Sequence, residues 1–202
     1  MILLACAVGK ELGFFTSVPH VEMLVTGVGP IEASASVARA LAQSRYSLVI
    51  NAGIAGAFDG AANVGDGVVI SEEFMELGLE TGAPVALPEG VRIVDHVSSD
   101  LRIVDRLVEA GFAALRGLTV SSVTATASTA KRLATFGVQA ESMEGFAVLR
   151  AAEMAGVPAV EVRGISNIVT DREQGKWNFA QGVRGLESVL TSLLSIVTAL
   201  HE

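Results

Sequence analysis

The sequence predicts a single α/β domain over residues 1–202, with a mixed, mostly parallel central sheet flanked by helices. Half of the residues are hydrophobic and only 18% are charged, which excludes a disordered chain and predicts a large core. Short apolar runs alternate with segments of helical periodicity, a pattern typical of a parallel sheet covered on both faces. No linker, internal repeat or low-complexity segment divides the chain.

Six short runs, most of them strongly apolar, predict the strands of this sheet. In chain order these runs are Ile2–Ala7, Val21–Thr26, Leu48–Ile50, Gly67–Ser71, Gly117–Val123 and Ala159–Ile165.

Four segments carry the periodicity of helices. In Ile31–Ala42 the apolar residues recur at the spacing of one helix face. Leu101–Ala110 follows Ser98, Ser99 and Asp100, which are good N-cap residues, and Met143–Ala155 follows Ser142. A long amphipathic helix near the end of the sequence has apolar positions at Leu186, Val189, Leu190, Leu193, Leu194 and Val197.

Charge and cysteine content exclude several classes of protein. The net charge is −8 with only 14 Lys and Arg residues, so the basic footprint of a nucleic-acid binder is missing. The single cysteine, Cys6, forbids an internal disulfide and fits a reducing compartment. No run reaches about 18 uncharged apolar residues, and no typical signal peptide is present. We therefore expect a cytoplasmic protein that does not bind a membrane.

Two glycine-rich segments follow predicted strands and leave room for a ligand near the backbone. Gly27–Pro30 precedes a helix, whose N-terminus favours negative charge; the alternative is a tight turn with proline at the first helical position. Asn51–Phe58 contains two glycines three positions apart. These glycines either open a backbone nest at the carboxyl end of the sheet or form a plain turn.

Charged residues at two strand ends are further candidates for a site. The segment Glu141–Gly145 places two carboxylates at a strand–helix junction, although compensation of the helix dipole also explains an acidic residue there. Arg163 lies in an apolar strand, where an unpaired charge is costly. It therefore requires an acidic partner, and Glu11 and Glu144 are the candidates. Zinc-ligand spacing, a phosphate-binding loop and a serine-nucleophile elbow are all missing, so no metal or cofactor is expected.

Taken in order, Glu11, Gly27–Pro30, Asn51–Phe58, Ser142-Met143-Glu144 and Arg163–Asn167 resemble the purine nucleoside phosphorylase/nucleosidase superfamily over nearly the whole chain. Met143-Glu144 together with Arg163–Ser166 is closest to the hydrolytic branch, which contains methylthioadenosine/S-adenosylhomocysteine nucleosidase and futalosine hydrolase. The resemblance implies a nucleoside phosphorylase-like fold and hydrolysis of a nucleoside by water. It also implies a homodimer or a higher homo-oligomer.

The resemblance implies roles for individual residues as well. Glu11 matches the carboxylate that activates the attacking water, and Arg163 matches the arginine that helps to hold that carboxylate and water. Glu144 matches the carboxylate that binds the ribose 2′- and 3′-hydroxyls, and Met143 the methionine under the sugar. Val123–Thr126 matches the segment that meets the edge of the purine. The predicted site residues beyond Glu11, Glu144, Met143 and Arg163 are Gly53, Ile54, Val123, Thr126, Ser166, Asn167, Arg172 and Trp177.

Three positions depart from the adenine-specific nucleosidase. Asn167 stands in place of an aspartate, Ile54 in place of a serine, and Ala125 in place of a phenylalanine that stacks on adenine. Val120–Thr126 and the residues around Asn167 look more like futalosine hydrolase, which releases hypoxanthine from futalosine in a menaquinone pathway. Methylthioadenosine/S-adenosylhomocysteine nucleosidase and a non-catalytic nucleoside-binding module are the alternatives.

Two chemical arguments agree with this interpretation. Asn167 cannot supply a proton, but its amide can donate a hydrogen bond to O6 or N7, which favours a 6-oxopurine. Futalosine also carries an aromatic carboxylate beyond C5′, which Arg172 and Trp177 are suited to bind. In the alternative interpretation, Arg172 pairs with Asp171 or Glu173 on the surface and Trp177 anchors a loop.

Overall fold

The computed structural model describes residues 1–77, 86–173 and 176–199. The elements in chain order are β1 (Ile2–Cys6), η1 (Gly9–Leu12), β2 (Val21–Val25), α1 (Pro30–Gln43), β3 (Leu48–Ala57), β4 (Gly67–Met75), β5 (His96–Ser98), α2 (Leu101–Glu109), β6 (Ala113–Thr119), α3 (Ala127–Ala134), β7 (Ala140–Ser142), α4 (Gly145–Met154), β8 (Ala159–Ile168) and α5 (Phe179–Ala199).

The sheet is mixed and partly closed on itself. The strands follow the order β2-β1-β3-β7-β6-β4-β5, and β8 pairs with both β3 and β4. Strands β3, β8, β4, β6 and β7 therefore form a closed ring of pairs, of which β3·β7 and β4·β8 are antiparallel. The prediction of a mixed, mostly parallel sheet is confirmed. The ring was not predicted, because it depends on pairings between distant segments.

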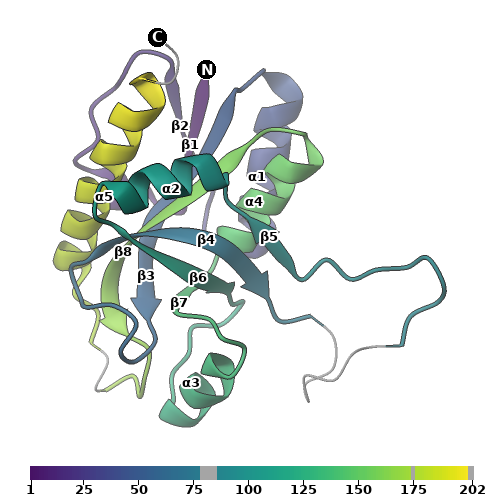
Figure 1. The fold of residues 1–202 in the computed structure, drawn as a ribbon, viewed down its shortest axis with the longest axis vertical. Coiled ribbons are helices and arrows are strands. Elements are labelled where there is room, and N and C mark those ends of the chain that lie inside the picture. Colours follow the sequence, from purple (N-terminus) through teal and green to yellow (C-terminus); the bar gives the residue numbers. More distant parts are fainter. Residues whose placement is uncertain (78–85, 174–175, 200–202) are drawn as a thin grey trace.

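Helices cover both faces of the sheet, as the apolar strands predicted. On one side, α2 and α5 pack over a cluster that includes Leu4, Ile50 and Val162. On the other side, α1 and α4 pack over a cluster that includes Leu3 and Val49. Figure 1 shows these two helical layers, with α3 lying apart from them near β7. Leu3 and Leu4 thus face opposite layers, which explains why β1 is buried along its whole length.

Several predicted boundaries were wrong. The second glycine-rich segment is neither a nest nor a turn, because β3 continues from Leu48 to Ala57 and pairs with β8 along this length. Strand β6 ends at Thr119 rather than 123, and α4 begins at Gly145 rather than 143. Strand β4 is also longer than expected, ending at Met75.

Two short elements, β5 and α3, escaped prediction, and no bounds were predicted for η1 and β7. Strands β5 and β7 have three residues each, which is too short for a clear periodicity. By contrast, α2 begins after Asp100 as expected, and the Asp100 carboxylate accepts a hydrogen bond from the Arg102 backbone amide at 3.0 Å.

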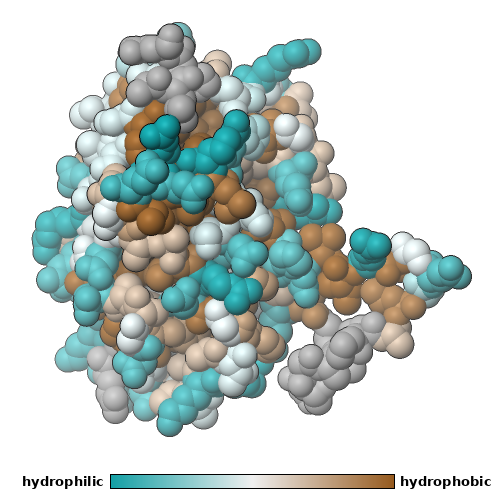
Figure 2. All heavy atoms as spheres, in the orientation of Figure 1, coloured by the Kyte–Doolittle hydropathy of each residue, from teal (hydrophilic) through white to brown (hydrophobic). Residues whose placement is uncertain are grey.

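The described residues before β5 project from the body of the molecule and expose apolar side chains. Figure 2 shows hydrophobic spheres along this projection. The exposed apolar residues here are Leu87, Val91, Ile93 and Val94. Apolar side chains gathered in this way are typical of a surface that contacts another molecule.

Candidate active site

A pocket of about 260 Å³ lies where the ends of several strands meet the first turn of α5. Its walls come from segments far apart in the sequence: the β1–η1 connection, the turn before α1, β3, β7, β8 and the start of α5. The lining residues are Ala7, Val8, Glu11, Val28, Ile54, Ala55, Gly56, Val123, Glu141, Ser142, Met143, Glu144, Ser166, Asn167, Trp177 and Phe179. Most of them are apolar, and the polar groups are few, as is usual for a small-molecule site.

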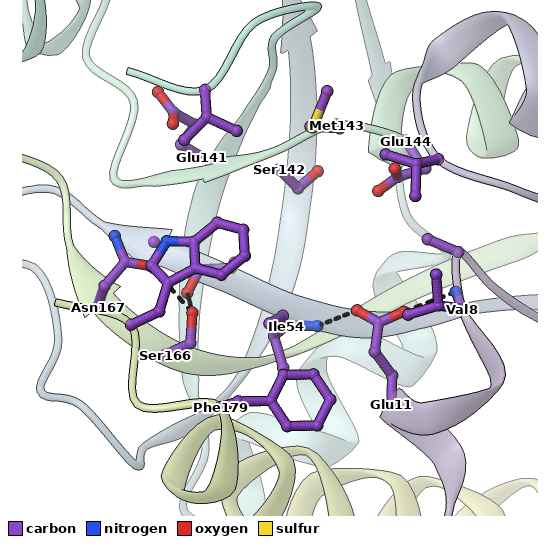
Figure 3. A pocket seen from close by; sticks show the side chains of 16 residues that line it. Val8, Glu11, Ile54, Glu141, Ser142, Met143, Glu144, Ser166, Asn167 and Phe179 are labelled. Carbon is purple, nitrogen blue, oxygen red and sulfur yellow. Dashed lines mark hydrogen bonds between the residues drawn. The ribbon is translucent and has the colours of Figure 1, made fainter. Parts of the chain in front are cut away.

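Glu11 is held at one end of the pocket by two backbone amides. Its Oε1 accepts a hydrogen bond from Ile54 N at 3.0 Å and its Oε2 one from Val8 N at 3.1 Å, as Figure 3 shows. Burial raises the pKa of Glu11 above its ordinary value, and the two amides and the charge of Arg163 oppose that shift. The result is a fixed carboxylate whose basicity exceeds that of an exposed glutamate, which suits a general base.

Glu144 lies near Glu11 and is bound at the N-terminus of α1. Its Oε1 accepts a hydrogen bond from Gly29 N at 2.8 Å. Gly29 is the N-cap of α1, with φ of 95°, and Pro30 is the first helical residue. The turn interpretation of Gly27–Pro30 is therefore right. The negative charge favoured by this helix N-terminus comes from the chain's own carboxylate.

Arg163 finds its partner on its own strand, and the expected pairing with Glu11 or Glu144 was wrong. Its Nε donates to Glu161 Oε1 at 2.7 Å, and only 2% of the Arg163 side chain is exposed. Side chains two positions apart on a strand face the same side of the sheet. The spacing of Glu161 and Arg163 in an otherwise apolar strand therefore already indicates that they pair. Arg163 Nη2 also donates to Ser142 Oγ at 3.2 Å.

Gly53 explains how Arg163 and Glu11 come so close. A Cβ built on Gly53 would lie 2.5 Å from Arg163 Nη1 and 2.9 Å from Glu11 Oε1. Any side chain at this position would displace both groups. Gly53 and Arg163 do not line the pocket; they lie behind it and support Glu11.

Asn167 and Glu141 form the opposite end of the pocket. Both pair with Gly56 in the sheet, Asn167 from β8 and Glu141 from β7. A Cβ on Gly56 would lie 2.9 Å from Asn167 Nδ2 and 2.8 Å from Val169 Cγ2, so only glycine leaves room for the Asn167 side chain here. Figure 3 shows Asn167 and Glu141 on the same side of the pocket. Ser166 Oγ lies 2.9 Å from Asn167 Oδ1 and 3.1 Å from the Ala55 carbonyl oxygen. The contact with Ser166 occupies the oxygen of the Asn167 amide, while its NH₂ donates to the Ile168 carbonyl oxygen at 3.4 Å and keeps a second hydrogen to donate.

Glu141 was a candidate as a carboxylate at a strand–helix junction, but no role was predicted for it. It accepts hydrogen bonds from the backbone amide of Thr124, at 3.0 Å, and from the Thr124 hydroxyl. Burial raises its pKa, while the contacts with Thr124 and the charge of Arg172 lower it. These contacts place an acceptor at the end of the pocket where Val123 also lines the wall.

The remaining predicted residues divide into two groups. Ile54, Met143 and Trp177 line the pocket, whereas Thr126 does not. The Thr126 hydroxyl is the N-cap of α3 and accepts from Thr129 N at 3.2 Å.

Arg172 also lies outside the pocket lining, but it contacts a residue of the pocket wall. Its guanidinium carbon lies 4.5 Å from the centre of the Trp177 ring, and its backbone amide donates to Ala125 O at 3.2 Å. Asp171, one proposed partner, instead accepts from Ala127 N at 2.7 Å. Within the described ranges, Arg172 makes no ion pair with a carboxylate.

Phe179 is a lining residue that the sequence did not reveal. It starts α5, and Figure 3 shows its ring beside Ile54. Its side chain is 39% exposed. The only sequence signal for Phe179 is an aromatic residue in a polar stretch, the same signal that singles out Trp177.

Comparison with known proteins agrees with this geometry. The model of the phosphorylase superfamily matches residues 13–201. The chain is 35% identical over 187 residues to futalosine hydrolase of Streptomyces coelicolor, covering 87% of this chain and 79% of that protein. It is 30% identical over 180 residues to futalosine hydrolase of Thermus thermophilus, covering 85% and 80%.

Solved structures show the same fold at lower identity. The methylthioadenosine/S-adenosylhomocysteine nucleosidase of S. pneumoniae has a TM-score of 0.80 at 21% identity, covering 96% of this chain and 97% of that one. The enzyme of the same name from Helicobacter pylori has a TM-score of 0.81 at 13% identity, with coverage of 96% and 97%. Among the described residues, no helix is both long and apolar enough to cross a membrane.

Proposed function

Because the chain belongs to the phosphorylase superfamily, we propose that it is an N-glycosyl hydrolase that cleaves futalosine into hypoxanthine and dehypoxanthine futalosine. The relatives that share 30–36% identity over most of the chain are futalosine hydrolases. The reaction belongs to menaquinone biosynthesis, and we place it in the cytoplasm.

Glu11 acts as the general base. An ionised carboxylate held by the Ile54 and Val8 amides can take a proton from a water within about 3 Å. The oxygen of that water then bonds to C1′ as the bond between C1′ and the base nitrogen breaks. Arg163 lies behind Glu11 and favours its ionised form, opposing the effect of burial.

Glu144 and Met143 bind the ribose. Gly29 N occupies Glu144 Oε1, and the carboxylate keeps lone pairs that can accept from the 2′- and 3′-hydroxyls. Its negative charge then lies near the sugar as positive charge develops at C1′ in the transition state. Met143 packs against the same part of the substrate.

Glu141 and Asn167, which line the same end of the pocket, determine which base is bound. A 6-oxopurine presents an N1–H donor and acceptors at O6 and N7, which match a carboxylate acceptor and an amide donor. A 6-aminopurine presents an acceptor at N1, which a carboxylate repels. The hypoxanthine anion also spreads its charge onto O6, so it leaves without a proton from Asn167.

Water is a better nucleophile here than phosphate. No Arg or Lys belongs to the described pocket lining, and Gly27–Pro30 and Asn51–Phe58 contain none. A phosphate dianion would have no cation to pair with and would lie near Glu11 and Glu144. This argues against a phosphorylase.

Arg172 and Trp177 bind the distal carboxyphenyl group of futalosine in this proposal. The stacked pair at the pocket wall supports it, because a guanidinium without an ion-pair partner among the described residues can receive a carboxylate. We also propose a homodimer or a higher homo-oligomer, for which the exposed apolar residues before β5 supply a contact surface.

A panel of nucleosides tests the proposal. Futalosine, inosine, methylthioadenosine and S-adenosylhomocysteine are incubated separately with the protein, and the released base is identified. We expect kcat/KM to be highest for futalosine. If methylthioadenosine or S-adenosylhomocysteine is cleaved with the higher kcat/KM, the adenine-specific alternative is correct, and if no base is released, the protein is a binding module.

The variant Glu141→Gln tests the role of Glu141 in the preference between bases. The glutamine amide can donate to N1 of a 6-aminopurine, so the preference for futalosine over methylthioadenosine should fall by about ten- to hundredfold. Glu153→Gln, on the exposed end of α4, is the matched control and should leave the preference unchanged.

A further inference from the structure

Two carboxylates that the proposed mechanism does not use lie buried behind the pocket. Glu73 on β4 and Glu161 on β8 both have 0% of their surface exposed. Neither lines the pocket. Burying an ionised carboxylate is costly unless it is paired, and the cation beside them is the single guanidinium of Arg163.

The two carboxyl groups lie close together against α4. Glu161 Oε2 and Glu73 Oε1 are each 2.6 Å from the position that a Cβ on Gly145 would occupy. On the other side of Glu73, a Cβ on Gly117 would lie 1.7 Å from Glu73 Oε2. Two glycines thus leave space for this pair in a core where a larger residue would displace them.

Not every carboxyl oxygen in this cluster has a hydrogen-bond donor. Glu161 Oε1 accepts from Arg163 Nε at 2.7 Å, and Glu73 Oε1 accepts from Thr119 Oγ1 at 2.7 Å. The Thr119 hydroxyl oxygen also accepts a hydrogen bond from Phe146 N at 2.7 Å. Its hydrogen is therefore the one donated to Glu73 Oε1. The two other carboxyl oxygens, Glu73 Oε2 and Glu161 Oε2, have no hydrogen-bond partner among the described residues.

A proton on one carboxyl group supplies a donor between the two oxygens that lie beside Gly145, Glu73 Oε1 and Glu161 Oε2. We propose that Glu73 keeps its proton and directs it toward Glu161, so that Glu161 alone carries the negative charge that positions the Arg163 guanidinium. Both are positioning residues, since they act on the substrate only through Arg163. Of the pair, Glu161 is the one bonded to the cation, and it is therefore the one that is ionised.

The surrounding charges agree with this assignment. Burial and then the charge of Glu161 raise the pKa of Glu73 well above its ordinary value. Burial also raises the pKa of Glu161, but the charge of Arg163 and its hydrogen bond to Glu161 oppose that shift. Glu144 adds a further negative charge that disfavours ionisation of both.

The arrangement has a consequence for Arg163. Burial alone would lower the pKa of its guanidinium, yet the neighbouring carboxylates of Glu161 and Glu144 raise it above the ordinary value. With Glu161 holding Nε, Nη2 reaches Ser142, and Nη1 lies beside Gly53 next to Glu11. The orientation of the cation behind the general base thus depends on the charge of Glu161.

Two isosteric variants test the assignment. Glu73→Gln keeps the shape and the neutrality of a protonated carboxyl group, so kcat for futalosine should stay within about threefold of wild type. Glu161→Gln removes the charge that holds Arg163, and kcat should fall by about 100-fold with KM little changed. Glu72→Gln is the control, because Glu72 is the neighbouring residue on β4 and makes a half-exposed pair with Arg116.

Infrared spectroscopy provides a measurement that needs no substrate. The wild-type protein at neutral pH should show the C=O band of a protonated carboxyl group that is lost in Glu73→Gln and kept in Glu72→Gln. An equal loss of kcat in Glu73→Gln and Glu161→Gln, or no such band in the wild type, would overturn the assignment. The turnover measurement rests on the proposed function, but the infrared result stands even if futalosine is not the substrate.

Discussion

Glu144 Oε1 accepts a hydrogen bond from Gly29 N at 2.8 Å, although 115 positions separate the two residues in the sequence. The contact joins the residue before α4 to the N-terminus of α1 and fixes one carboxylate of the pocket. It also occupies the amide that a bound anion would otherwise use. The helix N-terminus, which favours negative charge, thus already holds a carboxylate of the chain itself.

The first prediction concerns the general base. Glu11→Gln should lower kcat by about 10²- to 10⁴-fold, because an amide cannot accept the proton of the attacking water. The fold and substrate binding should persist, since a glutamine oxygen can still accept one of the two backbone hydrogen bonds. Steady-state kinetics and thermal melting check both parts, with the exposed Glu109→Gln as the control. Near-normal turnover would show that Glu11 is not the base.

The second prediction concerns the glycine behind Glu11. Gly53→Ala places a methyl group 2.5 Å from Arg163 Nη1 and 2.9 Å from Glu11 Oε1. Both side chains must move, and a shift of about 1 Å at a catalytic group can cost 10²-fold in rate. Gly9→Ala is the control, because its nearest neighbour would be Val25 Cγ2 at 3.8 Å, an ordinary contact. Equal kcat values for the two variants would contradict the role of Gly53.

The third prediction concerns the base. Asn167→Asp replaces an amide donor with a carboxylate beside Glu141, and the two like charges disfavour a 6-oxopurine with its acceptors at O6 and N7. The kcat/KM for futalosine should fall by about ten- to hundredfold. The loss should be smaller at acidic pH, where the new carboxyl group is protonated and can donate. A pH-independent loss would indicate that residue 167 acts only through packing.

The fourth prediction concerns the distal end of the substrate. Arg172→Ala should raise KM for futalosine about tenfold, which corresponds to a loss of about 1.4 kcal/mol of binding free energy. The cleavage of inosine should be unchanged. Inosine is the internal control because it lacks the carboxyphenyl group. Arg150→Ala, which removes a surface pair with Glu153, controls for net charge. Equal effects on the two substrates, or none on either, would remove Arg172 from the site.

The fifth prediction concerns stability against pH. Above the ordinary glutamate pKa of 4.5, the unfolded chain releases the proton of Glu73 while the folded protein keeps it. Folding in this pH range takes up a proton. As the pH rises toward the pKa of Glu73 in the folded protein, the free energy of unfolding of the wild type therefore falls by at most about 1.4 kcal/mol per pH unit.

Glu73→Gln lacks this dependence. Its Tm should therefore rise relative to wild type as the pH increases from 5 to 8, and the two curves should run parallel below about pH 4. Melting curves of the wild type, Glu73→Gln and Glu72→Gln across this range provide the measurement. Parallel curves over the whole range would mean that Glu73 is already ionised in the folded protein.

Much of the fold followed from the sequence because its signals are local. The apolar runs at β1, β3 and β8 and the periodicity of α1, α2 and α5 act over a few residues, and a few residues suffice to recognise them. The same holds for the N-cap at Asp100. The order of Glu11, the two glycine-rich segments, Met143-Glu144 and Arg163–Asn167 indicates the superfamily, and the match to the family model confirms it.

The contacts within the site depended on the tertiary structure. Nothing local shows that Glu141 and Asn167 both pair with Gly56, or that Gly53 lets Arg163 approach Glu11. These relationships arise from the register of distant strands. The partner of Arg163 lay two residues away and was missed in favour of more distant acids. Sequence thus determined which chemical groups the protein contains and the layers that bury them. The closure of the sheet decided which groups meet, because strand pairing, unlike helix periodicity, is set by residues far apart in the chain.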